Sequence, residues 1–189
     1  MSQKLSRQEQ KMLLTIAREA ITTKLNRVDL KPIEDYALSP SLLEEGASFV
    51  TLTKDGHLRG CIGNLEPSQS LAQDVQQRAI QAAFEDPRFP QLQSSELPFI
   101  RIEVSRISPL QPLHYENPAD LAKLIKPHRD GVILKAGYRR ATFLPQVWEQ
   151  LPKPEDFLAH LCQKMGMPSN YWKTSPMEVY LYTVEAFEE

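Results

Sequence analysis

Glycine is scarce in this chain of 189 residues, which has seven glycines and fifteen prolines. Proteins on average use about 7% glycine and about 5% proline, so the usual ratio is inverted. Three of the seven glycines, Gly56, Gly60 and Gly63, nevertheless fall within eight consecutive residues. Glycine permits positive φ angles and close backbone approach, so this cluster marks a candidate site. It does not indicate a reaction.

Other shortages exclude whole classes of protein. The sequence has no run of 18 apolar residues, so no transmembrane helix is expected. The first residues, MSQKLSRQEQK, lack the apolar core of a secretory signal. Two cysteines, Cys61 and Cys162, form no disulfide framework, which makes the cytoplasm the expected location.

The charge balance argues against a protein whose main task is to grip a phosphate backbone. The net charge is −2, from 22 basic and 24 acidic residues, whereas nucleic-acid-binding domains are usually basic overall. A local basic patch for nucleic acid stays compatible with this composition. The four histidines have no metal-ligand spacing, so no metal site is expected. Phosphate-binding and dinucleotide-binding glycine motifs are absent, and the cofactor stays unknown.

Hydrophobic periodicity predicts both helices and strands. The predicted helices cover residues 7–25, 68–84 and 155–165, with short helical segments at 117–125 and 145–151. The predicted strands cover residues 47–54, 57–62, 99–107, 132–134, 139–144 and 177–184. Asp55-Gly56 and Gly137 mark hairpin turns, which require antiparallel pairing. We therefore expect one α+β domain with a mostly antiparallel sheet and packed helices.

The glycine cluster contains the stretch LRGCIG at residues 58–63. Strict alternation along a strand would put Arg59, Cys61 and Gly63 on one face. A guanidinium beside a cysteine favours the reactive thiolate. In that interpretation Gly60 and Gly63 leave room for a ligand or for another backbone. The alternative is that Cys61 is a small buried apolar residue and that Gly60 forms a β-bulge.

The LRGCIG stretch also resembles the signature of the AMMECR1 domain family. Further segments are similar to that family, and the resemblance runs from about residue 7 to 184. These segments are AFEDPRFP at 83–90, IEVS at 102–105, DGV at 130–132, ATFLPQVW at 141–148 and LCQKMG at 161–166. One departure is Met165, where the family more often has alanine.

The resemblance implies an α+β fold with a larger lobe and a smaller sheet-containing lobe, and it places LRGCIG near a cleft between them. It also implies that the protein belongs with a radical-SAM protein and a Memo-type protein, which are then candidate partners. The family has no settled reaction, so the resemblance does not predict one.

Four further residues are candidates for the site. Glu103 lies on the polar face of its predicted strand and can orient Arg59 or act as a general base; a solvated strand face is the alternative. Arg88 can bind an anionic group, or it can form a structural pair with Asp86. Thr142 is a candidate for lining the same site; the alternative is that it only packs within its strand.

Three functions follow as hypotheses. The first is an enzyme in which Cys61 is the nucleophile or thiol donor, Arg59 its activator and Glu103 an orienting carboxylate, with a small anionic substrate. In this hypothesis Gly60, Gly63, Asp86, Arg88 and Thr142 contribute to binding. The second is a binding module for a nucleotide, RNA or a partner chain. The third is an accessory protein for the radical-SAM or Memo-like partner. The sequence sets no oligomeric state.

Overall fold

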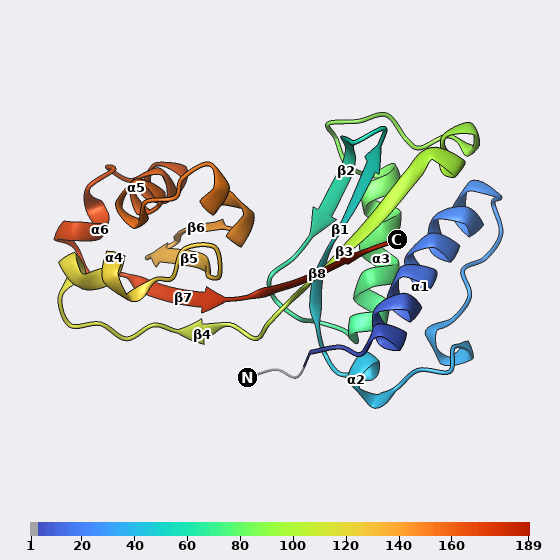
Figure 1. The fold of residues 1–189 in the computed structure, drawn as a ribbon, viewed down its shortest axis with the longest axis horizontal. Helices are drawn as coiled ribbons and strands as arrows, with labels where there is room; N and C mark the ends of the chain where they lie inside the picture. Colours follow the sequence, from blue (N-terminus) through green and yellow to red (C-terminus); the bar gives the residue numbers. More distant parts are fainter. Residues whose placement is uncertain (1–3) are drawn as a thin grey trace. The chain divides into compact units, whose positions relative to one another are not determined.

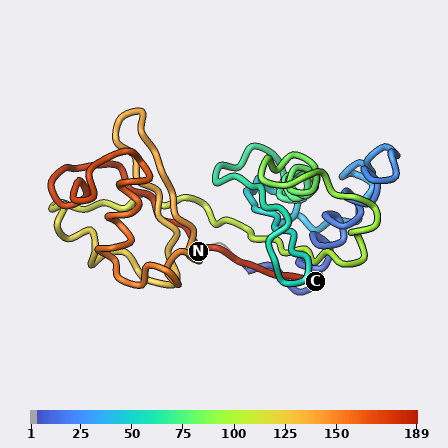
Figure 2. Tube along the Cα trace, turned by 90° about the horizontal axis from the view of Figure 1, so that it is seen from above, coloured from blue at the N-terminus to red at the C-terminus, as the bar shows by residue number. Residues whose placement is uncertain are grey.

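The computed structural model describes residues 4–189. The chain forms two compact units. Unit 1 contains the chain up to Ser108 together with residues 185–189, and unit 2 contains residues 109–184. The chain therefore leaves unit 1 once and returns to it once, as the tube in Figure 2 allows the reader to follow. Each unit has its own sheet and its own apolar core.

The longest helix of unit 1 is α1 (Arg7–Leu25), and it begins at a capping box in the sequence Ser6-Arg7-Gln8-Glu9, a spacing that marks a helix start. The Ser6 hydroxyl accepts the Glu9 N–H, and the Glu9 carboxylate accepts the Ser6 N–H. The short helix α2 (Pro40–Leu43) follows. Helix α3 (Leu71–Phe84) begins at the cap residue Ser70. Two 3-10 helices, η1 (Ile33–Asp35) and η2 (Ser94–Phe99), complete the unit.

The sheet of unit 1 has the strand order β2-β1-β3-β8. Its strands are β1 (Ala47–Lys54), β2 (His57–Gly63), β3 (Ile100–Ile107) and β8 (Val184–Glu188). Helices α1 and α3 pack against each other and against one face of this sheet (Figure 1). That face carries the fully buried Val50, Leu52, Ile102 and Val104, and such alternation of apolar and polar residues is typical of a strand with one buried face.

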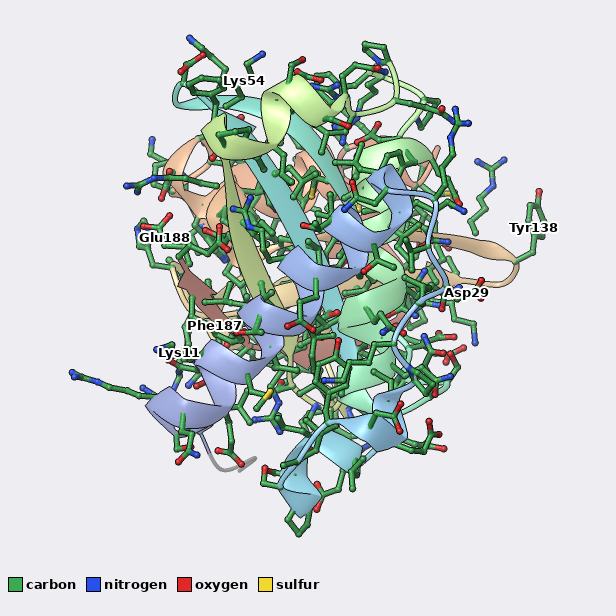
Figure 3. The ribbon with its side chains drawn as sticks, turned by 90° about the vertical axis from the view of Figure 1, so that its right-hand side faces the viewer. Lys11, Asp29, Lys54, Tyr138, Phe187 and Glu188 are labelled. Atoms are coloured by element: carbon green, nitrogen blue, oxygen red, sulfur yellow. The ribbon has the colours of Figure 1, made fainter. Side chains whose placement is uncertain are left out.

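The hairpin β1–β2 turns at Asp55 and Gly56, whose φ angles are 52° and 77°. Two consecutive positive φ angles are the property that makes Asp-Gly a hairpin turn. Lys54 marks this end of the sheet in Figure 3, close to η2. Strand β2 is at the edge of the sheet, so it has a neighbouring strand on one side only.

Unit 2 has a second antiparallel sheet, in the order β4-β7-β5-β6. Its strands are β4 (Gln111–Pro112), β5 (Gly131–Ala136), β6 (Arg139–Phe143) and β7 (Glu178–Tyr182). Its helices are η3 (Pro118–Asp120), α4 (Leu121–Leu124), η4 (Pro145–Glu149), α5 (Pro154–Lys164) and α6 (Tyr171–Thr174). The core residue Cys162 is fully buried on α5, beside the equally buried Leu158 and Leu161.

The α+β class and the antiparallel pairing are confirmed. The prediction of one closing strand over 177–184 is wrong. That segment is β7, and the chain then passes Thr183 and enters β8 in the other sheet. Periodicity continues through this segment, so nothing local marks the point where the chain changes sheets. In the part of the chain that the structure describes, no helix is long and apolar enough to span a membrane.

Candidate functional site

The candidate site lies on β2, where Cys61 is held by the loop that follows α3. Asp86 Oδ2 accepts the backbone N–H of Cys61 at 2.9 Å, and Arg88 Nη2 donates to the Cys61 carbonyl oxygen at 3.1 Å. These are the backbone groups that an edge strand leaves without a partner. Asp86 and Arg88, which are 25 and 27 positions away in the sequence, therefore bind the two backbone groups of Cys61.

Asp86 and Arg88 also bind each other. Arg88 donates through Nε and Nη2 to the two Asp86 carboxylate oxygens, at 2.9 and 2.7 Å. Asp86 is buried, whereas the Arg88 side chain is 54% exposed. The Arg88 hydrogen bonds, helped by the Cys61 N–H, hold the pKa of the Asp86 carboxyl well below its usual range, although burial opposes this. The pair predicted as a structural alternative therefore exists, and it also contacts the candidate cysteine.

The Cys61 thiol faces the neighbouring strand β1. Thr51 Oγ1 donates to Cys61 Sγ at 3.3 Å, and the two residues are directly paired in the ladder. Cys61 is partly exposed. Thr51 is paired on its other side with Glu103, so the three residues form one row across three strands.

Arg59 does not lie on the same face of β2 as Cys61, so the prediction from strict alternation is wrong. The register between β1 and β2 shifts between Leu52 and Thr53, because Leu52 is paired with Gly60 and Thr53 with Leu58. Arg59 is the additional residue of this β-bulge. Leu58 rather than Arg59 therefore lies on the face of Cys61.

Glu96, from η2, is the carboxylate that orients Arg59. Arg59 Nε and Nη2 each donate to one Glu96 oxygen at 3.0 Å, in a bidentate ion pair. Lys54 Nζ lies 3.1 Å from the same carboxylate. The Arg59 hydrogen bond is the largest cause that lowers the pKa of Glu96 to about 2, against the opposing effect of burial. The sequence offered Glu103 for this role and missed Glu96, whose proximity depends on how the 3-10 helix packs.

The two glycines beside Cys61 are explained by packing. A Cβ on Gly60 would lie 2.1 Å from the carbonyl oxygen of Ala82, so β2 passes directly against α3. A Cβ on Gly63 would lie 2.3 Å from the Phe49 ring and 2.4 Å from the Ser48 carbonyl oxygen. Contacts within the protein are therefore enough to require glycine at both positions, and no ligand is needed to explain them.

Glu103 and Thr142 form hydrogen bonds with residues other than Cys61. Glu103 accepts a hydrogen bond from Ser105 Oγ at 3.3 Å. It lies two strands from Cys61, which is about 10 Å in a sheet. Thr142 belongs to unit 2, where its hydroxyl donates to the Val132 carbonyl oxygen and lies 2.9 Å from the Tyr182 hydroxyl. The unit 1 site thus contains Arg59, Gly60, Cys61, Asp86 and Arg88.

Among residues 4–189, no group of three or more histidine, cysteine, aspartate or glutamate side chains is arranged to hold a metal ion.

Comparison with known proteins gives consistent matches along the chain. The AMMECR1 family model matches residues 14–187. Protein MK0488 of Methanopyrus kandleri is 38% identical, with 100% of this chain and 92% of that protein covered. A protein of Methanothermobacter thermautotrophicus is 39% identical, with 98% and 96% covered.

A solved structure shares the fold. The crystal structure of the uncharacterized protein PH0010 from Pyrococcus horikoshii superposes with a TM-score of 0.85 at 33% identity, and the match covers 98% of this chain and 93% of that one. The matched family model, the two archaeal relatives and this structure agree over nearly the whole length. The chain therefore belongs to the AMMECR1 family.

Proposed function

We propose that this protein is an enzyme that uses the Cys61 thiol as a nucleophile on a small anionic substrate. The observation that carries this proposal is the position of Arg88. Its guanidinium connects the buried Asp86 carboxylate to the Cys61 carbonyl oxygen, and its side chain is 54% exposed. A cation open to solvent therefore contacts the backbone of Cys61, which is itself partly exposed.

The surroundings of Cys61 suit nucleophilic attack. The Thr51 hydroxyl donates to the sulfur, and a hydrogen-bond donor together with a nearby cation stabilises negative charge on sulfur. Asp86 and Arg88 fix the backbone on both sides of the Cys61 Cα, which limits the positions that the thiol can take. In the reaction, Sγ forms a bond to an electrophilic carbon of the substrate. The leaving group departs with its electron pair, and the thiol proton passes to solvent.

The reactivity of Cys61 tests this proposal. The intact protein is alkylated with iodoacetamide between pH 6 and 9, and peptide mass spectrometry separates Cys61 from the buried Cys162. At pH 7 we expect Cys61 to react about tenfold faster than N-acetylcysteine. A rate at or below that of the free thiol across this range would overturn the proposal.

Thr51→Val keeps the shape of the side chain and removes the hydroxyl donor to sulfur. We expect it to slow the alkylation of Cys61. Thr53→Val is the matched control, because Thr53 lies two residues further along β1, on the same face, and is paired with Leu58 instead of Cys61. Equal slowing by both variants would count against a specific role of the Thr51 hydroxyl.

A second candidate is a binding module in which Cys61 only packs. It is favoured by the glycines, since the space beside Gly60 and Gly63 is filled by Ala82, Phe49 and Ser48. Cys61→Ser separates the two candidates. An enzyme loses its activity in cells with this variant, whereas a binding module keeps it.

The linkage to radical-SAM and Memo-type proteins remains part of the proposal and rests on the family resemblance. Co-purification from native extract tests it, with wild-type and Cys61→Ser proteins as paired baits. Retention of both partners by both baits would favour an accessory role over independent catalysis.

A further inference from the structure

Arg59 has a buried donor that the described structure does not use. The residue is 9% exposed, and its Nε and Nη2 atoms are both committed to Glu96. Its Nη1 atom is buried and has no hydrogen-bond partner. Buried donors are almost always paired with protein, water or a ligand, so an unpaired donor on a charged group calls for a partner.

Arg88 likewise commits Nε and Nη2 to a carboxylate. These two atoms bind Asp86, and Nη2 also binds the Cys61 carbonyl oxygen, while the side chain is 54% exposed. Both guanidinium groups lie near the ring of Phe89, with Cζ at 5.9 Å from the ring centroid for Arg59 and 5.5 Å for Arg88. The ring supplies only a distant cation–π contact and no lone-pair acceptor.

The local charges do not balance. Three cationic side chains, those of Lys54, Arg59 and Arg88, share two carboxylates, those of Glu96 and Asp86. One positive charge therefore remains in this cluster, where Lys54 and Arg59 share the Glu96 carboxylate. Guanidinium groups bind carboxylate and phosphate oxygens with well-defined geometry, so an oxyanion is the ligand that suits this excess.

We propose that Arg59 and Arg88 together form an oxyanion-binding subsite beside Cys61, and that it binds a carboxylate or phosphate group of the substrate. Phe89, which is partly exposed and lies near both guanidinium groups, moves aside when the anion enters. This inference rests on the proposed function, because it assigns the charged end of the substrate on which the thiol acts. Glu96 and Asp86 are positioning residues, since each holds one guanidinium group in place.

A comparison of a charged and a neutral alkylating agent tests the subsite. Iodoacetate is an anion and iodoacetamide is its neutral counterpart, so the ratio of their rates reports attraction of the anion independently of the reactivity of the thiol. At Cys61 we expect this ratio to exceed that of N-acetylcysteine by on the order of tenfold at low salt. Inorganic phosphate should protect Cys61 from iodoacetate with saturation. Sodium chloride at the same ionic strength should give no saturable protection of Cys61.

The matched variants are Arg59→Lys and Arg101→Lys. Lysine at position 59 keeps the positive charge beside Glu96 but lacks the forked set of donors, so the rate ratio should fall below that of the wild type. Arg101 is an exposed arginine on β3, and its replacement should leave the ratio unchanged. Phe89→Ala should raise the iodoacetate rate because it uncovers the subsite. Urea unfolding confirms that each variant is folded.

The result that overturns the subsite is a wild-type rate ratio equal to that of the free thiol, or an unchanged ratio in Arg59→Lys. The two proposals fail separately. Slow iodoacetamide labelling with saturable binding of phosphate, measured by calorimetry, removes the thiol chemistry and keeps the subsite. Fast iodoacetamide labelling with no effect of phosphate removes the subsite and keeps the thiol chemistry.

Discussion

Asp86 accepts the backbone N–H of Cys61 at 2.9 Å, across 25 positions of sequence. Asp86 lies in the loop after α3, and Cys61 lies on the edge strand of the sheet. Exposed edge strands pair readily with other chains. This hydrogen bond occupies the edge at the residue that carries the thiol, so one carboxylate both fixes Cys61 and prevents strand pairing there.

Asp86→Asn should destabilise unit 1. The variant keeps the shape of the side chain, but it removes the charge that binds Arg88. Its amide NH2 group then faces a donor of Cys61 or Arg88. We expect a loss of about 1.5–3 kcal/mol in the free energy of unfolding, because the buried carboxylate that accepts hydrogen bonds from Cys61 and Arg88 is lost. Urea denaturation measures this loss. Asp29→Asn, at an exposed position, is the control and should change stability by less than about 0.5 kcal/mol.

Gly60→Ala should destabilise the protein more than Gly56→Ala. At position 60 the new Cβ would meet the Ala82 carbonyl oxygen at 2.1 Å, so β2 or α3 has to move. The expected cost is about 3 kcal/mol or more, the upper range of overpacking. At position 56 nothing lies within 4 Å and only the φ of 77° is unfavourable, which costs about 1–2 kcal/mol. A smaller cost at Gly60 than at Gly56 in urea denaturation would contradict this packing.

The ion pair between Arg59 and Glu96 should make the stability depend on acid pH. The pKa of Glu96 is lowered from 4.5 to about 2 in the folded state, mainly by Arg59. A lowered folded pKa contributes stability that is fully present above pH 4.5 and is lost as the pH falls toward 2. We expect up to about 3 kcal/mol from this group.

Glu96→Gln tests this dependence by urea denaturation at pH 5.5 and pH 2.5. The difference in free energy of unfolding between wild type and variant should shrink at the lower pH, because wild-type Glu96 is then largely protonated in the unfolded state and partly so in the folded state. Glu34→Gln, at an exposed position, should give the same small difference at both pH values. A constant difference for Glu96→Gln would show that the pair contributes no pH-dependent stability.

Thr142→Val should affect unit 2 and leave Cys61 unchanged. The Thr142 hydroxyl binds the Val132 carbonyl oxygen and the Tyr182 hydroxyl, and Tyr182 keeps the Phe143 carbonyl oxygen as a partner in the variant. We expect a cost of about 1 kcal/mol for the lost hydrogen bonds. The rate of Cys61 alkylation should be that of the wild type. A slower rate would place Thr142 in the functional site, as the sequence suggested.

Local chemistry determined much of the fold from the sequence. The capping box at Ser6 and Glu9 set the start of α1, and Asp55-Gly56 set the hairpin, because both motifs act through atoms only a few residues apart. Apolar alternation identified the buried face of β3. The LRGCIG stretch and the segments around it were sufficient to identify the family.

Tertiary structure decided what those residues contact. The bulge at Arg59 breaks the alternation that would have placed it beside Cys61, and η2 supplies Glu96 as its partner from 37 positions away. The glycines that marked the site in the sequence are required by the Ala82 carbonyl oxygen and the Phe49 ring. A sequence records which residue is small but not which distant atom fills the space, since that depends on how a helix packs against a strand.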